Sequence, residues 1–324
     1  MKLHTTSGQH GTEIENKRSS ARSLLLPVLV LLTFLSLHGC TADNEADGIQ
    51  IVTTTGMIKD AAEHVVGEYA EVISLMGPGV DPHLYKASQG DITKLSQADI
   101  IFYNGLHLEG KMGEVFEKLA ALKPVVPVAH EIPDSLLRTV PGFAGAHDPH
   151  IWFDVSLWEH AVTAIVHTMQ QQDSAHAEAY AANGKAYLKQ LDSLHQAVKS
   201  AIATIPETQR VLITAHDAFG YFGDAYHIEV RGLQGISTVS EFGLKDRIDL
   251  TDFIIERKIK AIFIETSVSP RSIQAVVEGC REKGWEVKIG GSLFSDAMGA
   301  EGSPEGTYLG MVNANVKTIV EALK

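Results

Sequence analysis

Short apolar runs alternate with amphipathic segments along most of this chain, and that alternation limits its fold more than any other feature. Apolar runs typical of strands lie at 49–54, 72–76, 100–103, 125–128, 211–214, 229–233, 261–265 and 286–289. Segments with helical spacing of apolar residues lie between them or follow them, at 57–68, 88–97, 113–122, 219–226, 250–257, 270–283 and 308–324. Strands that alternate with helices over short connections predict parallel sheets covered by helices on both faces. The chain is therefore expected to be an α/β protein.

One long helix interrupts this alternation. Apolar residues recur there at three- and four-residue steps, with no proline before position 206: Tyr187, Leu191, Leu194, Val198 and Ile202. A helix over 180–205 is roughly 40 Å long and can join two lobes rigidly, although an ordinary long surface helix fits the same pattern. The expected organisation is two doubly wound parallel-sheet lobes, 48–174 and 206–324, joined by a long rigid α-helix within 175–205.

The first 39 residues are typical of a lipoprotein signal peptide. The basic residues Lys17, Arg18 and Arg22 precede a mostly apolar run over 24–37, which is shorter than the roughly 20 apolar residues of a transmembrane helix. The sequence Leu37-His38-Gly39-Cys40 resembles a bacterial lipobox, and residues 40–47 form a polar tether. These features predict an extracytoplasmic protein that is lipid-anchored to a membrane at Cys40. An uncleaved anchor is the alternative, and it also places the remaining chain outside the cytoplasm.

Four residues far apart in the chain suggest a metal site. The tripeptide Asp-Pro-His occurs twice, ending at His83 and at His150, and the second lobe supplies His216 and Asp296. Three imidazoles and one carboxylate are a complete ligand set for a borderline divalent cation such as Zn²⁺. His83 is expected on a loop just past a strand end, where parallel sheets bind ligands, and His150 is expected to open a helix. His216 and Asp296 also follow strand-like runs, so the sequence predicts a metal ion captured between two lobes.

Each of these residues also has an ordinary structural interpretation. An Asp-Pro-His tripeptide is often a surface turn, a histidine at a strand end is often structural, and a lone aspartate is often a helix N-cap. The coincidence of four such residues favours the metal site. Three aspartates next to the histidines are expected either to accept hydrogen bonds from the ligands or to serve only in turns. They are Asp81, Asp148 and Asp217, and His147 is the best spare ligand.

Charge and missing motifs weigh against other functions. The formal net charge of −13 argues against nucleic-acid binding, which requires a basic face. The sequence has neither a His-Glu-x-x-His motif nor a Gly-x-Ser-x-Gly motif. Four protein ligands would also leave no open position for an activated water, so a zinc hydrolase is disfavoured and no enzyme is expected.

Several segments together resemble the solute-binding lipoproteins of zinc- and manganese-importing ABC transporters, the TroA-like group. The resemblance covers nearly all of residues 48–324 and rests on the segments GPGVDPHLYKAS, NGLHLEGKM, HDPHIWFD, TAHDAFGYF, GLQGISTVSE, AIFIETSV and GGSLFSDAMG. It implies two α/β lobes joined by one rigid helix, with the metal at their interface. It also implies that His83 and His150 bind the metal from the first lobe, and His216 and Asp296 from the second.

The resemblance implies zinc or manganese as the transported ion. Manganese-dedicated members often carry glutamate where this chain has His216, and an imidazole favours Zn²⁺ over the harder Mn²⁺. Many zinc-dedicated members carry a long His-rich loop between the first two ligands, which this chain lacks, so Mn²⁺ and Fe²⁺ also remain candidates. The implied partners are an ABC permease and its ATPase, and the protein is expected to be a monomer. A metal-stabilised, adhesin-like lipoprotein is the alternative.

Overall fold

The computed structural model describes residues 48–140, 145–239 and 243–324. The predicted signal peptide, the lipidation residue Cys40 and the tether 40–47 lie outside these residues. None of the helices in the described part is long and apolar enough to span a membrane.

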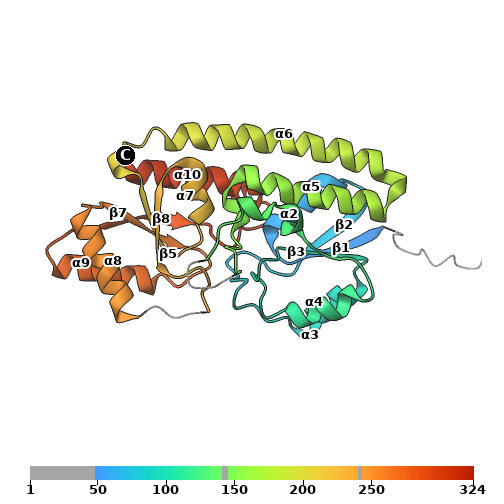
Figure 1. Ribbon diagram of the computed structural model, residues 1–324, viewed down its shortest axis with the longest axis horizontal. Coiled ribbons are helices and arrows are strands. Elements are labelled where there is room, and N and C mark those ends of the chain that lie inside the picture. Colours follow the sequence, from blue (N-terminus) through green and yellow to red (C-terminus); the bar gives the residue numbers. More distant parts are fainter. Residues whose placement is uncertain (1–47, 141–144, 240–242) are drawn as a thin grey trace, which may run out of the picture. The chain divides into compact units, whose positions relative to one another are not determined.

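Four parallel strands form the sheet of the first lobe (Figure 1). They are β1 (Ile49–Thr53), β2 (Ala70–Ser74), β3 (Ile100–Tyr103) and β4 (Val125–Pro127), in the order β2-β1-β3-β4. The connecting helices are α2 (Gly56–Val66), α3 (Gln89–Gln97) and α4 (Gly113–Ala120). Helix α3 begins where expected because Ser88 and Asp91 each accept a hydrogen bond from the backbone of the other, as in a capping box.

The second lobe contains two pairs of parallel strands. They are β5 (Val211–His216) with β6 (Glu229–Gln234), and β7 (Ala261–Glu265) with β8 (Lys288–Leu293). Strands β5 and β7 lie side by side, so the pairs repeat the arrangement of the first sheet without forming one continuous sheet. The accompanying helices are α7 (Gly220–Tyr226), α8 (Leu244–Glu256), α9 (Arg271–Glu282) and α10 (Tyr308–Leu323).

In the second lobe, two element boundaries differ by more than three residues from the sequence-based expectation. Strand β8 continues through Gly290-Gly291. Ile289 pairs with Ile262 and Gly291 pairs with Phe263, so Gly290 is an extra residue without a partner on β7, a β-bulge. A Cβ at Gly290 would lie 2.7 Å from Ala322, so only glycine fits there without rearrangement. Helix α8 begins at Leu244, six residues before the predicted start, and its first turn is capped by the Asp246 carboxylate.

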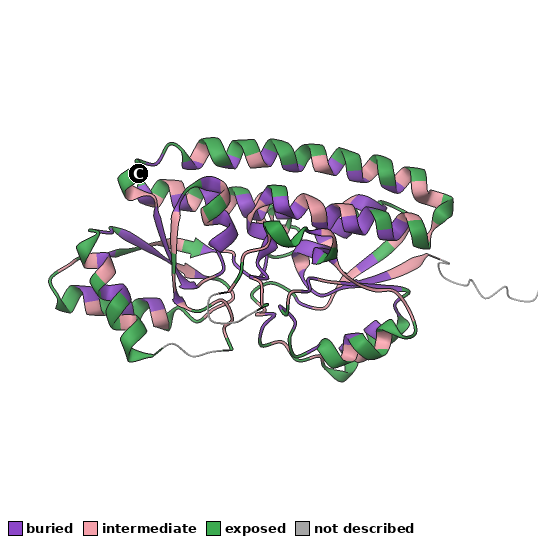
Figure 2. Ribbon diagram, viewed as in Figure 1, coloured by how far each residue is buried: buried purple, intermediate pink, exposed green. Residues whose placement is uncertain are grey.

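Helix α5 (Val155–Gln172) ends the first lobe, and helix α6 (Ala177–Ile202) connects the two lobes. Helix α6 packs against α2 and α5 of the first lobe and against α7 and α10 of the second (Figure 1). Its outer face is exposed, and its buried residues form one stripe at three- and four-residue steps (Figure 2). The pattern seen in the sequence is therefore the face of α6 that covers both lobes.

The largest apolar cluster belongs to both lobes at once. It includes Ile51 and Trp158 from the first lobe, Leu212 and Phe263 from the second, and Leu191 from α6. Smaller clusters lie on the opposite faces of the strands, under α3 and α4 in the first lobe and under α8 and α9 in the second. Because one continuous core crosses the junction, large relative movements of the lobes would expose apolar surface.

Candidate metal centre

Four side chains converge where the two lobes meet. His83, His150, His216 and Asp296 each offer one ligand atom, and these atoms all lie within 4.8 Å of one another. The Nε2 atoms of His83 and His150 are 3.2 Å apart, and His216 Nε2 lies 3.3 Å from Asp296 Oδ2. Ligand atoms at about 2.0–2.1 Å from a tetrahedral ion are about 3.3 Å from one another. These two pairs have the spacing of ligands around a tetrahedral ion, whereas His83 Nε2 and Asp296 Oδ2 are somewhat farther apart, at 3.9 Å.

The ends of strands and the loops that follow them hold these four residues. His83 lies on the loop after β2, as predicted, and Asp296 lies on the loop after β8. His216 is the last residue of β5 and does not follow it. His150 does not open an α-helix: a 3₁₀ turn, Ile151–Phe153, follows it, and α5 begins at Val155 after the N-cap Asp154. The difference arises because the Asp154 carboxylate caps the first turn of α5.

The four side chains are almost completely buried, and several of their polar atoms have no protein partner. His216 Nε2 and both carboxylate oxygens of Asp296 make no hydrogen bond to any described residue. His216 Nε2 and Asp296 Oδ2 are close to each other, but they are not aligned for a hydrogen bond. Buried polar atoms are normally paired, because leaving them unpaired costs free energy. A divalent cation bound among them would satisfy all three atoms.

Two carboxylates outside the cluster orient the imidazoles. His150 donates its Nδ1–H to Asp148 Oδ1 at 2.7 Å, and His216 donates its Nδ1–H to Glu265 Oε2 at 2.6 Å. Each carboxylate also accepts the backbone N–H of the same histidine. With Nδ1 protonated, the lone pair of Nε2 faces the centre of the cluster.

Glu265 was not anticipated from the sequence. It ends the apolar strand β7 beside the end of β5, which carries His216. A charged residue at the end of a fully apolar strand, at the same sheet edge as a candidate ligand, was the available signal. It became informative only once β5 and β7 were known to be neighbours.

The other residues singled out in the sequence have different roles. Asp81 binds no imidazole: it accepts the backbone N–H of His83 at 2.9 Å and the hydroxyl of Thr238 at 2.6 Å. Asp217 is half-buried, and burial raises the pKa of its carboxyl, as does the nearby charge of Asp148. His147 pairs with Thr139 in an isolated β-bridge and lies outside the cluster of four.

Burial and neighbouring charges push the ionisable groups of the cluster in different directions. Burial lowers the pKa of His83 to about 3, although the charge of Asp296 opposes this. Burial would also lower the pKa of His216, but Asp296 and Glu265 outweigh it and hold that pKa well above its ordinary value. Burial would raise the pKa of Asp296, but His216 outweighs it and holds that pKa well below its usual range. These opposite shifts favour a charged His216 beside an ionised Asp296 when no metal is bound.

A second layer of hydrogen bonds holds the ligand loops. Buried Glu109 accepts the backbone N–H of Asn104 at 2.8 Å and the hydroxyl of Thr54 at 2.6 Å. Asn104 in turn donates its side-chain amide to the carbonyl of Pro149 at 2.9 Å, directly before His150. Asn104 and Glu109 of the segment NGLHLEGKM therefore support the second Asp-Pro-His tripeptide.

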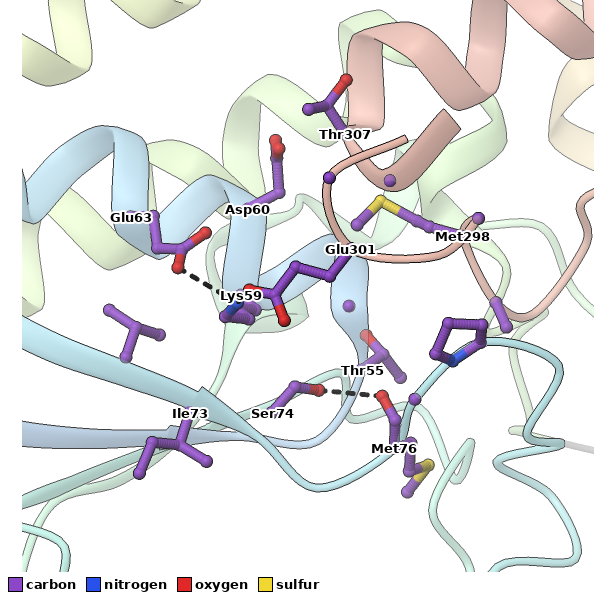
Figure 3. Close-up of a pocket in the computed structure, with 18 of the residues that line it drawn as sticks. Thr55, Lys59, Asp60, Glu63, Ile73, Ser74, Met76, Met298, Glu301 and Thr307 are labelled. Carbon is purple, nitrogen blue, oxygen red and sulfur yellow. Dashed lines mark hydrogen bonds and ion pairs between the residues drawn. The ribbon is translucent and has the colours of Figure 1, made fainter. Parts of the chain in front are cut away.

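A separate pocket of about 490 Å³ lies beside the cluster. It is lined by α2, β2 and the loop after Asp296, and Lys59 crosses it to contact Glu63 and Glu301 at 3.2 and 2.9 Å (Figure 3). Of the four clustered residues, only Asp296 lines this pocket. The candidate metal centre is therefore the buried cluster and not the larger open space.

Comparisons with known proteins point to one family. Residues 51–322 match the family model described as zinc-uptake complex component A, periplasmic. The manganese-binding lipoprotein MntA of Bacillus subtilis is 49% identical over 304 residues, which cover 92% of this chain and 99% of MntA. The zinc-binding protein TroA of Treponema pallidum is 47% identical over 282 residues, which cover 87% of this chain and 91% of TroA. The solved structure of that periplasmic TroA matches 85% of this chain and 99% of its own length, with a TM-score of 0.83 and 47% identity.

Proposed function

The chain belongs to the ZnuA family of periplasmic zinc-uptake components, and on that premise we propose that it captures a divalent metal ion outside the cytoplasm and delivers it to an ABC permease. The permease and the ATPase that drives it are the proposed partners. The observation that carries the proposal is the buried cluster of four ligand atoms, three of its polar atoms having no hydrogen-bond partner in the described chain. We assign His83, His150, His216 and Asp296 as the ligands.

The ligand set supports zinc and manganese as the transported ions. Three imidazoles suit Zn²⁺, and a given site of nitrogen and oxygen ligands generally binds Zn²⁺ more tightly than Mn²⁺. Two close relatives are named for manganese and for zinc binding, respectively. We therefore propose that both ions bind at the same four residues, with Zn²⁺ the tighter, and that Fe²⁺ is a weaker third ligand. Because histidine binds metal as the neutral imidazole, acid should release the ion.

The organisation of the chain follows from this function. We propose that residues 48–174 and 206–324 act as the two lobes, with 175–205 as the rigid link between them. Cys40 is proposed to carry the lipid that keeps the protein at the membrane near its permease, with residues 40–47 as the tether. The protein is proposed to act as a monomer, because both halves of the metal site come from the same chain.

Substitution of the ligands tests the site. The protein would be purified without added metal and analysed for bound elements, and Zn²⁺, Mn²⁺ and Fe²⁺ would then be compared by competition titration. The variants His83→Ala and Asp296→Ala should each weaken zinc binding by at least about 100-fold, because each removes a ligand. His167→Ala and Asp249→Ala are matched surface controls and should bind like the wild type. Wild-type stoichiometry and affinity in both ligand variants would rule out this site.

We expect no hydrolytic activity from the same site. Catalytic zinc usually keeps three protein ligands and one open position for water, whereas four protein side chains meet here. Ester or peptide hydrolysis that disappears on chelation, and that His83→Ala also abolishes, would contradict this expectation.

A further inference from the structure

Arg138 lies beside the ligand loop of the first lobe without touching the four clustered residues. Its backbone carbonyl accepts the N–H of Asp148 at 2.9 Å, so the two residues are held next to each other. Its side chain is partly buried and extends between two carboxylates. Nε lies 3.6 Å from Asp148 Oδ2, and Nη1 donates to Asp224 on α7 of the second lobe.

The buried carboxylate of Asp148 requires a compensating positive charge nearby. Its oxygen Oδ1 accepts two hydrogen bonds from His150, but Oδ2 is buried and has no hydrogen-bond partner among the described residues. The residue is only 1% exposed, and a buried carboxylate without a compensating charge is costly. Arg138 Nε is likewise buried and without a hydrogen-bond partner in the described chain, and it lies opposite Oδ2. The guanidinium of Arg138 therefore compensates the carboxylate that orients His150.

The second lobe encloses this pair. The Tyr221 hydroxyl, on α7, accepts the backbone N–H of Arg138 at 3.0 Å and donates to the carbonyl of Asp148 at 2.9 Å. At Gly220, the first residue of α7, a Cβ would lie 2.7 Å from Arg138 Nε and 2.9 Å from Asp148 Oδ2. The start of α7 thus packs directly on the Arg138–Asp148 pair, and it can do so only without a side chain.

We propose that Arg138 is a positioning residue that couples the rate of metal dissociation to the contact between the lobes. It keeps Asp148, and through it the imidazole of His150, in place while α7 lies against the pair. When α7 moves away, Arg138 loses Asp224 and the Asp148 loop loses Tyr221, so His150 is held less firmly and the ion dissociates faster. The inference rests on the proposed metal-binding function.

The rate of zinc dissociation tests this coupling. The full protein would be loaded with Zn²⁺ and mixed with excess chromogenic chelator. Arg138→Gln should release zinc about 10–100-fold faster, the usual effect of losing a residue that supports a ligand. Arg138→Lys should recover part of the loss, and Asp224→Asn should have a smaller effect in the same direction. Arg231→Gln, which removes an exposed arginine paired with Glu229 within the second lobe, is the control and should release zinc like the wild type.

A double-mutant cycle and an NMR signal distinguish a specific effect on the position of His150 from a general destabilisation of the protein. Because Asp224 acts through Arg138, Asp224→Asn should add nothing in the Arg138→Gln background. In the Co²⁺-loaded protein, the Nδ1–H protons of His150 and His216 should give shifted NMR signals. Arg138→Gln should speed solvent exchange of the His150 proton. It should leave the His216 proton, which is bonded to Glu265, unchanged.

Three results would overturn the inference: a dissociation rate of Arg138→Gln within about twofold of the wild type, full additivity of the two substitutions, or equal changes in both Nδ1–H signals. Should Arg138→Gln fail to fold, Asp224→Asn alone decides, since Asp224 is mostly exposed: a wild-type dissociation rate in that variant would overturn the coupling. If Arg138→Gln releases zinc at the wild-type rate and the wild type binds zinc normally, the coupling is wrong but the proposed function stands. If His83→Ala and Asp296→Ala bind zinc normally, the proposed metal site itself is wrong.

Discussion

Single side chains in and around the cluster show why burial of these polar groups favours binding of a cation. His150 and His216 each have one nitrogen committed to a carboxylate, which leaves the other nitrogen directed at the centre. Asp296 contributes two buried oxygens that accept no hydrogen bond from any described residue. The same low-dielectric surroundings that make unpaired atoms costly also strengthen their attraction to a metal ion.

Glu265→Gln tests the orienting role of a carboxylate at this scale. An amide can replace only one of the two acceptor oxygens, so either the Nδ1–H or the backbone N–H of His216 loses its partner. We expect zinc affinity to fall about 10–100-fold. Competition titration against a chelator of known affinity measures this, with Glu229→Gln at the surface as the control. Unchanged affinity would mean that Glu265 serves only the fold.

The charge of His216 predicts proton release on metal binding. Its pKa in the metal-free protein is held well above its ordinary value, so we expect His216 to carry a proton near neutral pH and to lose it when it binds Zn²⁺. About one proton should be released, and affinity should rise about tenfold per pH unit until the pH exceeds the raised pKa of His216. Calorimetry at pH 7 in buffers of different ionisation enthalpy measures the proton. A binding enthalpy that does not depend on the buffer would contradict the charged state of His216.

At the scale of helices and strands, close approach decides where glycine is required. Gly184 of α6 faces α5, where a Cβ would lie 2.3 Å from a methyl carbon of Val166. Gly184 therefore lets the long helix lie close against α5, and it belongs to the buried stripe that covers both lobes. A residue that looks unfavourable in a helix is here a packing requirement.

Gly184→Ala should destabilise the metal-free protein by about 1–3 kcal/mol, although alanine is the better helix former by about 1 kcal/mol. Urea denaturation measures the change. Gly113→Ala, at the start of α4 where nothing lies within 4 Å of the new Cβ, is the control and should be nearly neutral. Adding Val166→Ala should recover part of the loss. A more stable Gly184→Ala variant would show that α5 and α6 separate without cost.

For the whole molecule, the shared core limits how the lobes can move. Apolar residues from both sheets and from α6 form one cluster, so wide opening would expose much of it to water. Contacts that cross between the lobes at the site are smaller, such as the hydrogen bond from Thr238 to Asp81 and that from Trp152 Nε1 to the Ser295 carbonyl. Metal release therefore requires only local shifts or a small tilt.

Hydrogen exchange with and without zinc tests this rigidity. We expect the amides of α5 and α6 to exchange equally in both states, because the core behind them does not change. Protection gained with zinc should be confined to the loops around His83, His150, Thr238 and Asp296. Solution scattering should give nearly equal radii of gyration for the two states. Zinc-dependent protection across α6, or a clear compaction, would indicate a hinge and contradict the account.

Much of this could be predicted from local patterns in the sequence. Periodicity located the strands and helices, since the spacing of apolar residues reflects which face is buried. The Asp-Pro-His tripeptides stood out because proline stiffens the turn that carries each histidine. The end of β8 was missed because a remote contact, the bulge at Gly290, decides it, whereas the starts of α5 and α8 were missed although local caps set them. The second lobe has the parallel strands that the alternation predicts, but local patterns do not specify that they form two pairs, with β5 and β7 side by side and not paired.

The four candidate ligands and the α/β class are thus properties of the linear chain, because they depend on residue type and on neighbours a few positions away. The orientation of the imidazoles is not. It depends on Glu265 for His216 and on Asp148 for His150, and in our proposal on Arg138 and Asp224 behind Asp148. Glu265, Arg138 and Asp224 have no special pattern in the sequence and acquire roles only through the residues that lie opposite them. Electrostatic and hydrogen-bonding energies vary steeply with distance, so only the folded arrangement determines which charges compensate one another and which remain available for a metal ion.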